Sequence, residues 1–190
     1  MFTDFSKVLI CGGYYKSGQI SDTCEVIDLD STSTTCKDPP NFPATVNVAI
    51  GGIGFKENPI ICSGFQNTFY SNRCYSLENN EWASFPSMNS ARSFAAADQL
   101  QDGKLLVTGG LISDTAEMLT EEGWESKIPS LPFIINFHCM VTVNSTTVMV
   151  IGGNQNEQIS AKVFSSPLEI QVGLKDLKWS IKELTRVVEE

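Results

Sequence analysis

The stretch Lys104-Leu105-Leu106-Val107-Thr108-Gly109-Gly110 places a short apolar run directly before two glycines. This stretch decides the fold because its pattern recurs along the chain, at 8–13, 60–64 and 148–153. The last glycines of the four copies are 51, 46 and 43 residues apart. A self-similar period of this length is the signature of a repeat architecture. The recurrence therefore predicts that the chain packs as consecutive copies of one structural unit.

Further strand patterns lie on both sides of each glycine pair. A polar loop follows the glycines and leads to a second short strand pattern, at 24–29, 74–77, 116–119 and 161–164. Before the third and fourth pairs, the apolar runs 92–97 and 138–143 lead through a turn into the glycine-ended strand, which is typical of a β-hairpin. A fourth segment in the two middle units carries Trp82 or Trp124. One unit is therefore predicted to be four short strands.

Taken together, these features resemble the kelch repeat. Its blades carry a strand ending in Gly-Gly, an aromatic or apolar residue after a loop, and a tryptophan several residues later. Here Tyr75 precedes Trp82 by 7 residues, and Met118 precedes Trp124 by 6. The resemblance covers about residues 7–165 and implies a β-propeller.

The sequence departs from the kelch pattern in the first two units. Cys36 stands where the first tryptophan would fall, and Ser63 replaces the first glycine of the second pair. The first unit also lacks its opening hairpin. Large side chains of the repeat are expected to fill the gaps between neighbouring blades rather than to bind a ligand. These packing residues are Tyr75, Trp82, Arg92 and Trp124.

The expected fold is all-β: a β-propeller arc of about four kelch-like blades, each a four-stranded antiparallel sheet. The kelch-like repeats are assigned to residues 1–166, with blades near 7–40, 41–88, 89–132 and 133–166. Propellers typically have four to eight blades, and kelch-like ones usually have six or seven. We therefore expect the chain to be part of a longer propeller, with a closed four-bladed ring as the alternative.

Residues 167–190 are compatible with two structures. Apolar residues from Leu174 to Val188 fall at helical spacing, which is typical of a short helical tail. Alternatively, 179–184 aligns with 124–129 and supplies the fourth strand of the last blade, with Trp179 in a packing role. The alignment favours the strand.

Composition excludes several classes of partner. The formal net charge is −9, and arginine occurs only at 73, 92 and 186, so no basic stripe for nucleic acid is present. Anionic membrane surfaces are disfavoured for the same reason. No apolar run approaches the roughly 18 residues of a membrane span, and residues 1–7 do not have the shape of a signal peptide. Basic or neutral partners are expected instead.

The six cysteines follow the repeat and include no Cys-x-x-Cys pair. Cys11 and Cys62 each precede the glycines, while Cys24 and Cys74 open the following strand. Because these strands are antiparallel neighbours, at least one disulfide within a blade is expected. Cys62–Cys74 is the favoured pair, and Cys11 and Cys24 are the equivalent candidates in the first unit. Pairing of Cys24 with Cys36, or buried free thiols, are the alternatives.

Disulfides would place the protein in an oxidising compartment, so an extracellular or secreted location is expected, with a cytoplasmic one as the alternative. The sequon Asn144-Ser145-Thr146 lies at a predicted hairpin tip, which makes Asn144 a candidate glycosylation site.

No catalytic constellation is found in the sequence. The single histidine, His138, lies at a predicted strand start and is interpreted as a packing residue. No Gly-x-Ser-x-Gly elbow or phosphate-binding loop occurs, so no catalytic, cofactor-binding or metal-ligating residue is assigned. The expected function is that of a non-enzymatic module that binds a protein or glycan partner, as the kelch resemblance implies. The alternative is a fragment of a galactose-oxidase-like copper oxidase whose ligands lie outside this chain.

Overall fold

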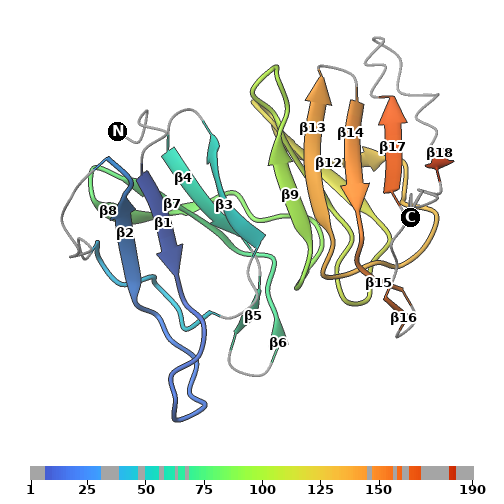
Figure 1. Ribbon diagram of the computed structural model, residues 1–190. Helices are drawn as coiled ribbons and strands as arrows, with labels where there is room; N and C mark the ends of the chain where they lie inside the picture. The colour runs from blue at the N-terminus through green and yellow to red at the C-terminus, as the bar shows by residue number, and fades with distance from the viewer. Residues whose placement is uncertain are drawn as a thin grey trace. The chain divides into compact units, whose positions relative to one another are not determined.

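The computed structural model describes residues 7–30, 39–46, 50–55, 58–62, 64–66, 69–144, 147–155, 158–159, 163–167 and 180–182. These residues form 18 strands, and no helix occurs in the described part of the chain (Figure 1). Every strand pairing is antiparallel. The predicted all-β class is therefore confirmed.

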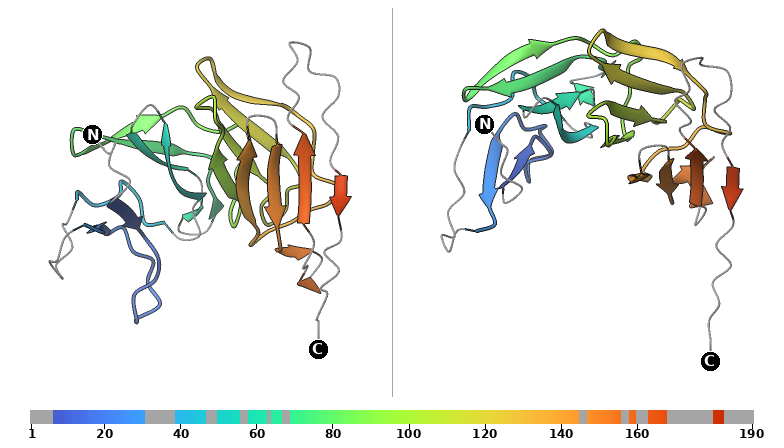
Figure 2. Two further views of the ribbon diagram at one scale, coloured as in Figure 1. Left: turned by 45° about the horizontal axis from the view of Figure 1, so that its top comes forward. Right: turned by 90° about the horizontal axis from the view of Figure 1, so that it is seen from above.

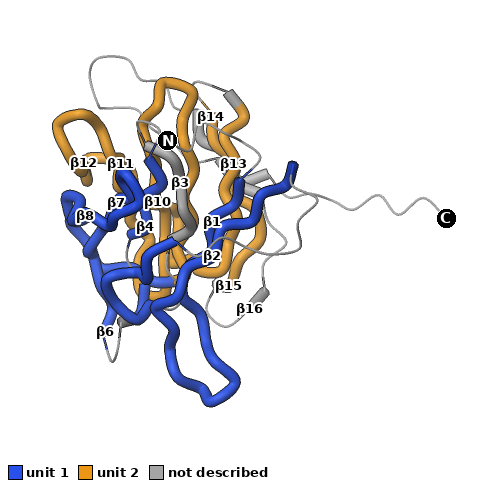
Figure 3. Tube along the Cα trace, turned by 90° about the vertical axis from the view of Figure 1, so that its left-hand side faces the viewer, with its two compact units in different colours: residues 1–93 blue, residues 94–190 orange. Residues whose placement is uncertain are grey.

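The chain divides into two compact units, residues 1–93 and 94–190 (Figure 3). Unit 1 holds a pair of strands, β1 (Lys7–Cys11) and β2 (Cys24–Asp28). It also holds a four-stranded sheet in the order β3 (Ile50–Phe55), β4 (Asn58–Cys62), β7 (Cys74–Glu78), β8 (Glu81–Phe85). A small hairpin, β5 (Phe65–Gln66) and β6 (Phe69–Tyr70), lies between β4 and β7 in the sequence.

Unit 2 contains two four-stranded sheets. The first has the order β12 (Gly123–Ile128), β11 (Ala116–Thr120), β10 (Leu105–Thr108), β9 (Ala96–Gln99). The second has the order β13 (Cys139–Asn144), β14 (Thr147–Ile151), β17 (Val163–Pro167), β18 (Ser180–Lys182), and its strands lie side by side in Figure 2. A hairpin of β15 (Asn154–Gln155) and β16 (Gln158–Ile159) follows β14. Ser180–Lys182 thus forms a strand, whereas Trp179 lies outside the described residues.

The core of unit 2 lies where its sheets pack. All four residues of β10 are buried, so other parts of the unit cover both faces of this strand. Leu106 packs in one cluster with Met118 of the same sheet and with Val148 and Val150 of β14. The apolar run of β10 is therefore covered on both faces, whereas the residues of β1 alternate between half-buried and exposed.

The predicted packing role of the tryptophan is confirmed for Trp82 in unit 1. Its indole Nε1–H donates to the carbonyl oxygen of Pro40 at 2.9 Å. Phe42 packs edge-on against both Trp82 and Tyr75, with ring centroids 4.9 and 5.1 Å apart. The aromatic residues of one repeat therefore contact the segment that leads out of the preceding repeat.

The strand predicted from the run 92–97 begins later than expected. β9 starts only at Ala96, because Phe94 has a backbone φ of 55°, outside the β region. Arg92 instead lies in the segment before the strand and is buried. The apolar character of the run indicated a strand, but local backbone geometry shortened it.

The second glycine of each of the first three pairs makes a backbone hydrogen bond to a segment further along its own unit. Its N–H donates to a carbonyl oxygen in the segment that enters the next repeat. The three bonds are Gly13 to Val46 at 3.0 Å, Gly64 to Arg92 at 3.0 Å, and Gly110 to Ile135 at 2.9 Å. All three acceptor residues are buried. Arg92 thus occupies the position that aliphatic residues hold in the other two repeats.

Close approach of the backbone explains the first glycine of the third pair. A Cβ atom on Gly109 would lie 2.5 Å from the carbonyl oxygen of Ile135 and 2.8 Å from Cε1 of His138. Its φ of +65° is also disfavoured for residues with a side chain. Gly103, in the turn between β9 and β10, has a similar φ of +86°, but a Cβ atom there would meet no other atom within 4 Å.

We therefore predict that Gly109→Ala destabilises the protein by at least about 2 kcal/mol more than Gly103→Ala, as measured by chemical denaturation. Both variants incur the conformational cost of positive φ, but only Gly109→Ala drives a methyl group into backbone. Equal losses of unfolding free energy in the two variants would show that the contact with Ile135 does not constrain this position.

Candidate functional site

The most variable part of the repeat lies at one end of its sheets. After the glycines, each chain segment protrudes before it returns as the next strand, and we call these segments the rim loops. They include 14–20, the hairpin β5–β6, 111–112 and the hairpin β15–β16 (Figure 1). The first is a hairpin closed by a bridge between Tyr14 and Ile20, whereas the third is a turn with Ser113 N–H bonded to Gly110 O at 3.3 Å.

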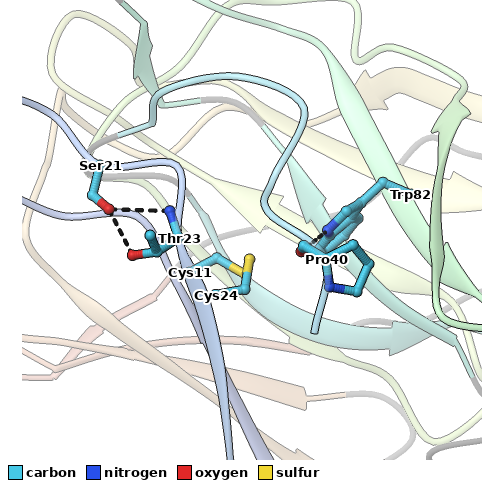
Figure 4. Close-up of a disulfide and its surroundings, with 6 residues drawn as sticks. All are labelled: Cys11, Ser21, Thr23, Cys24, Pro40 and Trp82. Carbon is cyan, nitrogen blue, oxygen red and sulfur yellow. Dashed lines mark hydrogen bonds between the residues drawn. A yellow bond between two sulfur atoms is a disulfide. The ribbon is translucent and has the colours of Figure 1, made fainter. Parts of the chain in front are cut away.

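A Ser-Asp-Thr tripeptide follows the rim loop in the first and third repeats. Ser21 Oγ lies 2.7 Å from Thr23 Oγ1 and accepts a hydrogen bond from Thr23 N–H at 3.0 Å (Figure 4). Ser113 and Thr115 repeat this arrangement at 2.7 and 3.1 Å. Short-range bonds of this kind fix the local backbone without a regular strand.

The middle residue of this motif, and Asn72 at the equivalent place in the second repeat, ties the loop base to the segment that leads toward the next repeat. Its carbonyl oxygen accepts a backbone hydrogen bond from a buried apolar residue. The three bonds are Phe42 to Asp22 at 2.7 Å, Met88 to Asn72 at 2.9 Å, and Leu131 to Asp114 at 2.7 Å. The sequence interpretation missed this motif, although the tripeptide at 21–23 and 113–115 was a signal that could have revealed it.

The rim loops expose large apolar and aromatic side chains. Tyr14, Tyr15 and Phe69 of unit 1 are 62%, 46% and 56% exposed. In unit 2, Ile112 at the tip of its turn is 70% exposed. Aromatic residues are enriched at protein interfaces because they contribute large contact areas at low entropy cost.

Acidic residues gather at the opposite end of the sheets. The registers place Asp28 and Glu78 of unit 1 away from the glycines, and they place Glu121 and Glu122 of unit 2 likewise. The rim loops of unit 1 carry one charged residue, Lys16. The rim loops of unit 1 therefore contribute no negative charge.

Unit 2 presents an unusual aromatic pair at the entrances to β9 and β13. The rings of Phe94 and Phe137 have centroids 4.1 Å apart, and Phe137 N–H donates to Phe94 O at 3.0 Å. Both residues have a φ of 55°. Positive φ is uncommon for bulky residues and costs free energy, so it persists only where the surroundings enforce it.

His138, the single histidine, is buried behind this pair. Its Nε2 lies 2.9 Å from Thr108 Oγ1, which in turn donates to Met140 Sδ at 3.6 Å. Burial lowers the pKa of His138 from 6.5 to about 4, and a hydrogen bond to the backbone of Thr108 opposes this only in part. The imidazole is therefore neutral at physiological pH and packs in the interior.

The structure brings two cysteine pairs to disulfide distance. Cys11 and Cys24 have Cα atoms 4.1 Å apart (Figure 4). Cys62 and Cys74 have Cα atoms 4.0 Å apart. Each pair lies at the base of a unit 1 rim loop. Cys139 is a free, exposed thiol, whereas Cys36 lies outside the described residues. The candidate glycosylation residue Asn144 ends β13, and the rest of its sequon lies outside the described residues.

Metal clusters and membrane-spanning helices are both absent from the described part of the chain. No group of three or more histidine, cysteine, aspartate or glutamate side chains is arranged there to hold a metal ion. The same residues contain no helix that is long and apolar enough to cross a membrane.

The low pKa of His138 predicts a pH-dependent stability. Because the unfolded histidine binds its proton near pH 6.5, the unfolded state binds more protons between about pH 6.5 and 4. Stability should therefore fall by up to about 3 kcal/mol as the pH falls through this window. Denaturation at several pH values measures the unfolding free energy of the wild type and of His138→Gln. The fall in stability between pH 6.5 and 4 should be smaller in the variant, because it has no imidazole to protonate. An imidazole that titrates near its ordinary pKa in the NMR spectrum of the folded protein would contradict this.

Comparison with known proteins places the fold. No protein-family model matches this chain, and no curated protein matches its sequence. The solved structure of YjhT, a kelch-repeat propeller protein, matches with a TM-score of 0.75 at 13% sequence identity. The match covers 94% of this chain but 62% of the YjhT chain, so this chain spans less than two thirds of that protein. The chain thus has the fold of part of a kelch-type β-propeller.

Proposed function

We propose that this chain is a non-enzymatic interaction module whose rim loops bind a protein or glycan partner. The observation that carries the proposal is that the rim loops expose aromatic side chains at their tips, while hydrogen bonds hold the backbone at their bases. Tyr15 and Phe69 are exposed on loops whose ends are fixed by backbone bonds to the next repeat. A loop that is already ordered loses less conformational entropy when a partner binds.

The cysteine pairs add to this preorganisation. Cys11 and Cys24 are separated by 13 residues and Cys62 and Cys74 by 12, and each pair encloses one rim loop of unit 1. Closing a loop of this length restricts the unfolded chain and contributes about 3 kcal/mol to stability in the chain-entropy model. The third repeat has Thr108 opposite Ala116 at the same place, and its rim loop is a short turn. The long loops with exposed aromatic tips are therefore the ones with a covalent closure.

The distribution of charge indicates the kind of partner. The only charged residue in the rim loops of unit 1 is Lys16, while Asp28 and Glu78 lie at the far ends of their strands. Partner surfaces that are neutral at the contact are therefore favoured there. Basic groups on a partner would be attracted by the net charge of the whole chain.

We further propose that the protein acts in an extracellular or secreted setting. Disulfides persist in oxidising compartments and are rare in the cytosol. Two cysteine pairs at disulfide distance favour the first setting over the cytoplasmic alternative.

Alkylation of protein from its native source, before and after reduction, tests this setting. We predict that only Cys36 and Cys139 are alkylated before reduction, and that reduction exposes Cys11, Cys24, Cys62 and Cys74. Intact mass and peptide mapping measure both outcomes. Six thiols that react without reduction would contradict the disulfides and the oxidising compartment together.

Binding screens test the proposed function. The immobilised chain is screened against a random-peptide display library and an array of neutral glycans, and its copper content is measured. We predict binders whose affinity falls at least about tenfold in at least one of the variants Tyr15→Ser, Phe69→Ser and Ile112→Ser. Asp28→Asn, at the opposite end of unit 1, is the matched control and should bind normally. Stoichiometric copper with oxidation of a sugar alcohol would instead support the copper-oxidase alternative.

A further inference from the structure

The two-stranded sheet of the first repeat leaves one of its faces in water. Val8 and Ile10 are the exposed residues of β1, whose burial alternates, so they share one face of the sheet. The register sets Ile27 of β2 directly across from Val8, and side chains opposite each other in an antiparallel pair are neighbours. Val8, Ile10 and Ile27 are 42%, 51% and 37% exposed, and we call them the first face.

The fourth repeat has an exposed apolar sheet face of its own. Val141 of β13 lies directly across from Met149 of β14, so the two side chains are neighbours. Ile151 alternates with the buried Val150 and therefore shares the face of Met149. Val141 and Ile151 are 48% and 39% exposed, Met149 is half-buried, and we call these three residues the second face.

Other repeats show what covers a face like the first one. Ile10, Ile61 and Val150 occupy the same place in their repeats, two residues before the position of the first glycine. Ile61 is buried in one apolar cluster with Leu9 of the preceding repeat. Val150 is buried in one apolar cluster with Leu106 of the preceding repeat. The first face is therefore of the kind that the sheet of a preceding repeat covers.

The covering residues also keep their place in the repeat. Leu9 and Leu106 stand three residues before the first glycine, as Met149 does in the fourth repeat. Leu9 and Leu106 pack toward the following repeat, whereas Met149 belongs to the exposed second face. A contact between a face of the second kind and a face of the first kind is thus already made within each unit. Because both exposed faces are apolar, joining them would remove apolar surface from water.

We propose that two copies of this chain associate head to tail, with the second face of one copy packed on the first face of the other. The occupant is a second copy because the chain carries both complementary faces, and contacts inside each unit show that such faces fit together. The contact is heterologous, since it joins different surfaces of the two copies. It lies on the sheets and not on the rim loops, so it is independent of the proposed function.

Sedimentation equilibrium of the wild-type chain measures the association. We expect species larger than a monomer to accumulate as the concentration is raised to about 100 μM. Ile10→Glu places a charge on the first face and Val141→Glu places one on the second, so each variant alone should raise the dissociation constant at least about tenfold. Ile112→Glu, at an exposed isoleucine of the rim, is the matched control and should associate as the wild type does. A non-reducing gel of the same samples excludes covalent linkage through the exposed Cys139.

Mixing the two variants identifies the faces. Ile10→Glu keeps the second face and Val141→Glu keeps the first, so an equimolar mixture retains one complete contact and should form a mixed dimer with the affinity of the wild-type contact. Variants that had merely lost their fold would not associate on mixing. Both replaced side chains are exposed, so the Tm of each variant should stay close to that of the wild type. If Ile10→Glu lowers the Tm, Ile10→Thr keeps a β-branched side chain and should still weaken the association.

The remaining outcomes overturn the inference in distinguishable ways. A wild type that stays monomeric at about 100 μM would refute the association itself. Association that survives Val141→Glu but not Ile10→Glu would show that two first faces meet each other. A mixture of the two variants that stays monomeric would show that the second face does not bind the first. Loss of association in Ile112→Glu would place the contact on the rim.

Discussion

The backbone hydrogen bond from the second glycine of one repeat to the entering segment of the next is the interaction on which the rest of the structure depends. In the third repeat it joins Gly110 N–H to Ile135 O. Gly109 lies so close to the same carbonyl that a Cβ atom would be 2.5 Å from it. A single blade cannot bury its apolar faces alone, so this approach of two backbones is what allows Ile135 to pack fully buried against the sheet before it. The glycines are therefore a consequence of packing between repeats.

This constraint separates a constant scaffold from a variable rim. The carbonyl oxygens of Asp22 and Asp114 accept equivalent backbone bonds, although the loops before them differ in length. The loop base is fixed in each repeat, so the loop tip can change without disturbing the core. Exposed Tyr15 and Ile112 lie on such tips. A fixed scaffold with variable loops is typical of folds in which rigid elements position the residues that bind.

Unit 2 combines strain and burial around the entrance to β13. Phe137 has positive φ and an exposed ring, whereas His138 next to it is buried and neutral because its pKa is lowered. The two residues alternate between solvent and core as neighbours in a strand do, but the backbone between them is not that of a strand. The same entrance in the preceding repeat carries Phe94 with the same φ. The aromatic pair is therefore a feature of the repeat, whereas the buried imidazole belongs to this site alone within the chain.

The sequence alone determined the all-β class, the repeat, the packing of Trp82 and the proximity of the two cysteine pairs. These follow from local spacing, because antiparallel neighbours joined by a loop must bring Cys62 opposite Cys74. Only the tertiary structure decided the exposure of Phe137 and the burial of Arg92. The residue type and sequence position of Phe137 and Arg92 do not show whether each side chain is buried or exposed. That is set by hydrogen bonds between segments distant in sequence. Local patterns specify which backbone can form, but contacts between repeats specify which side chains remain in water.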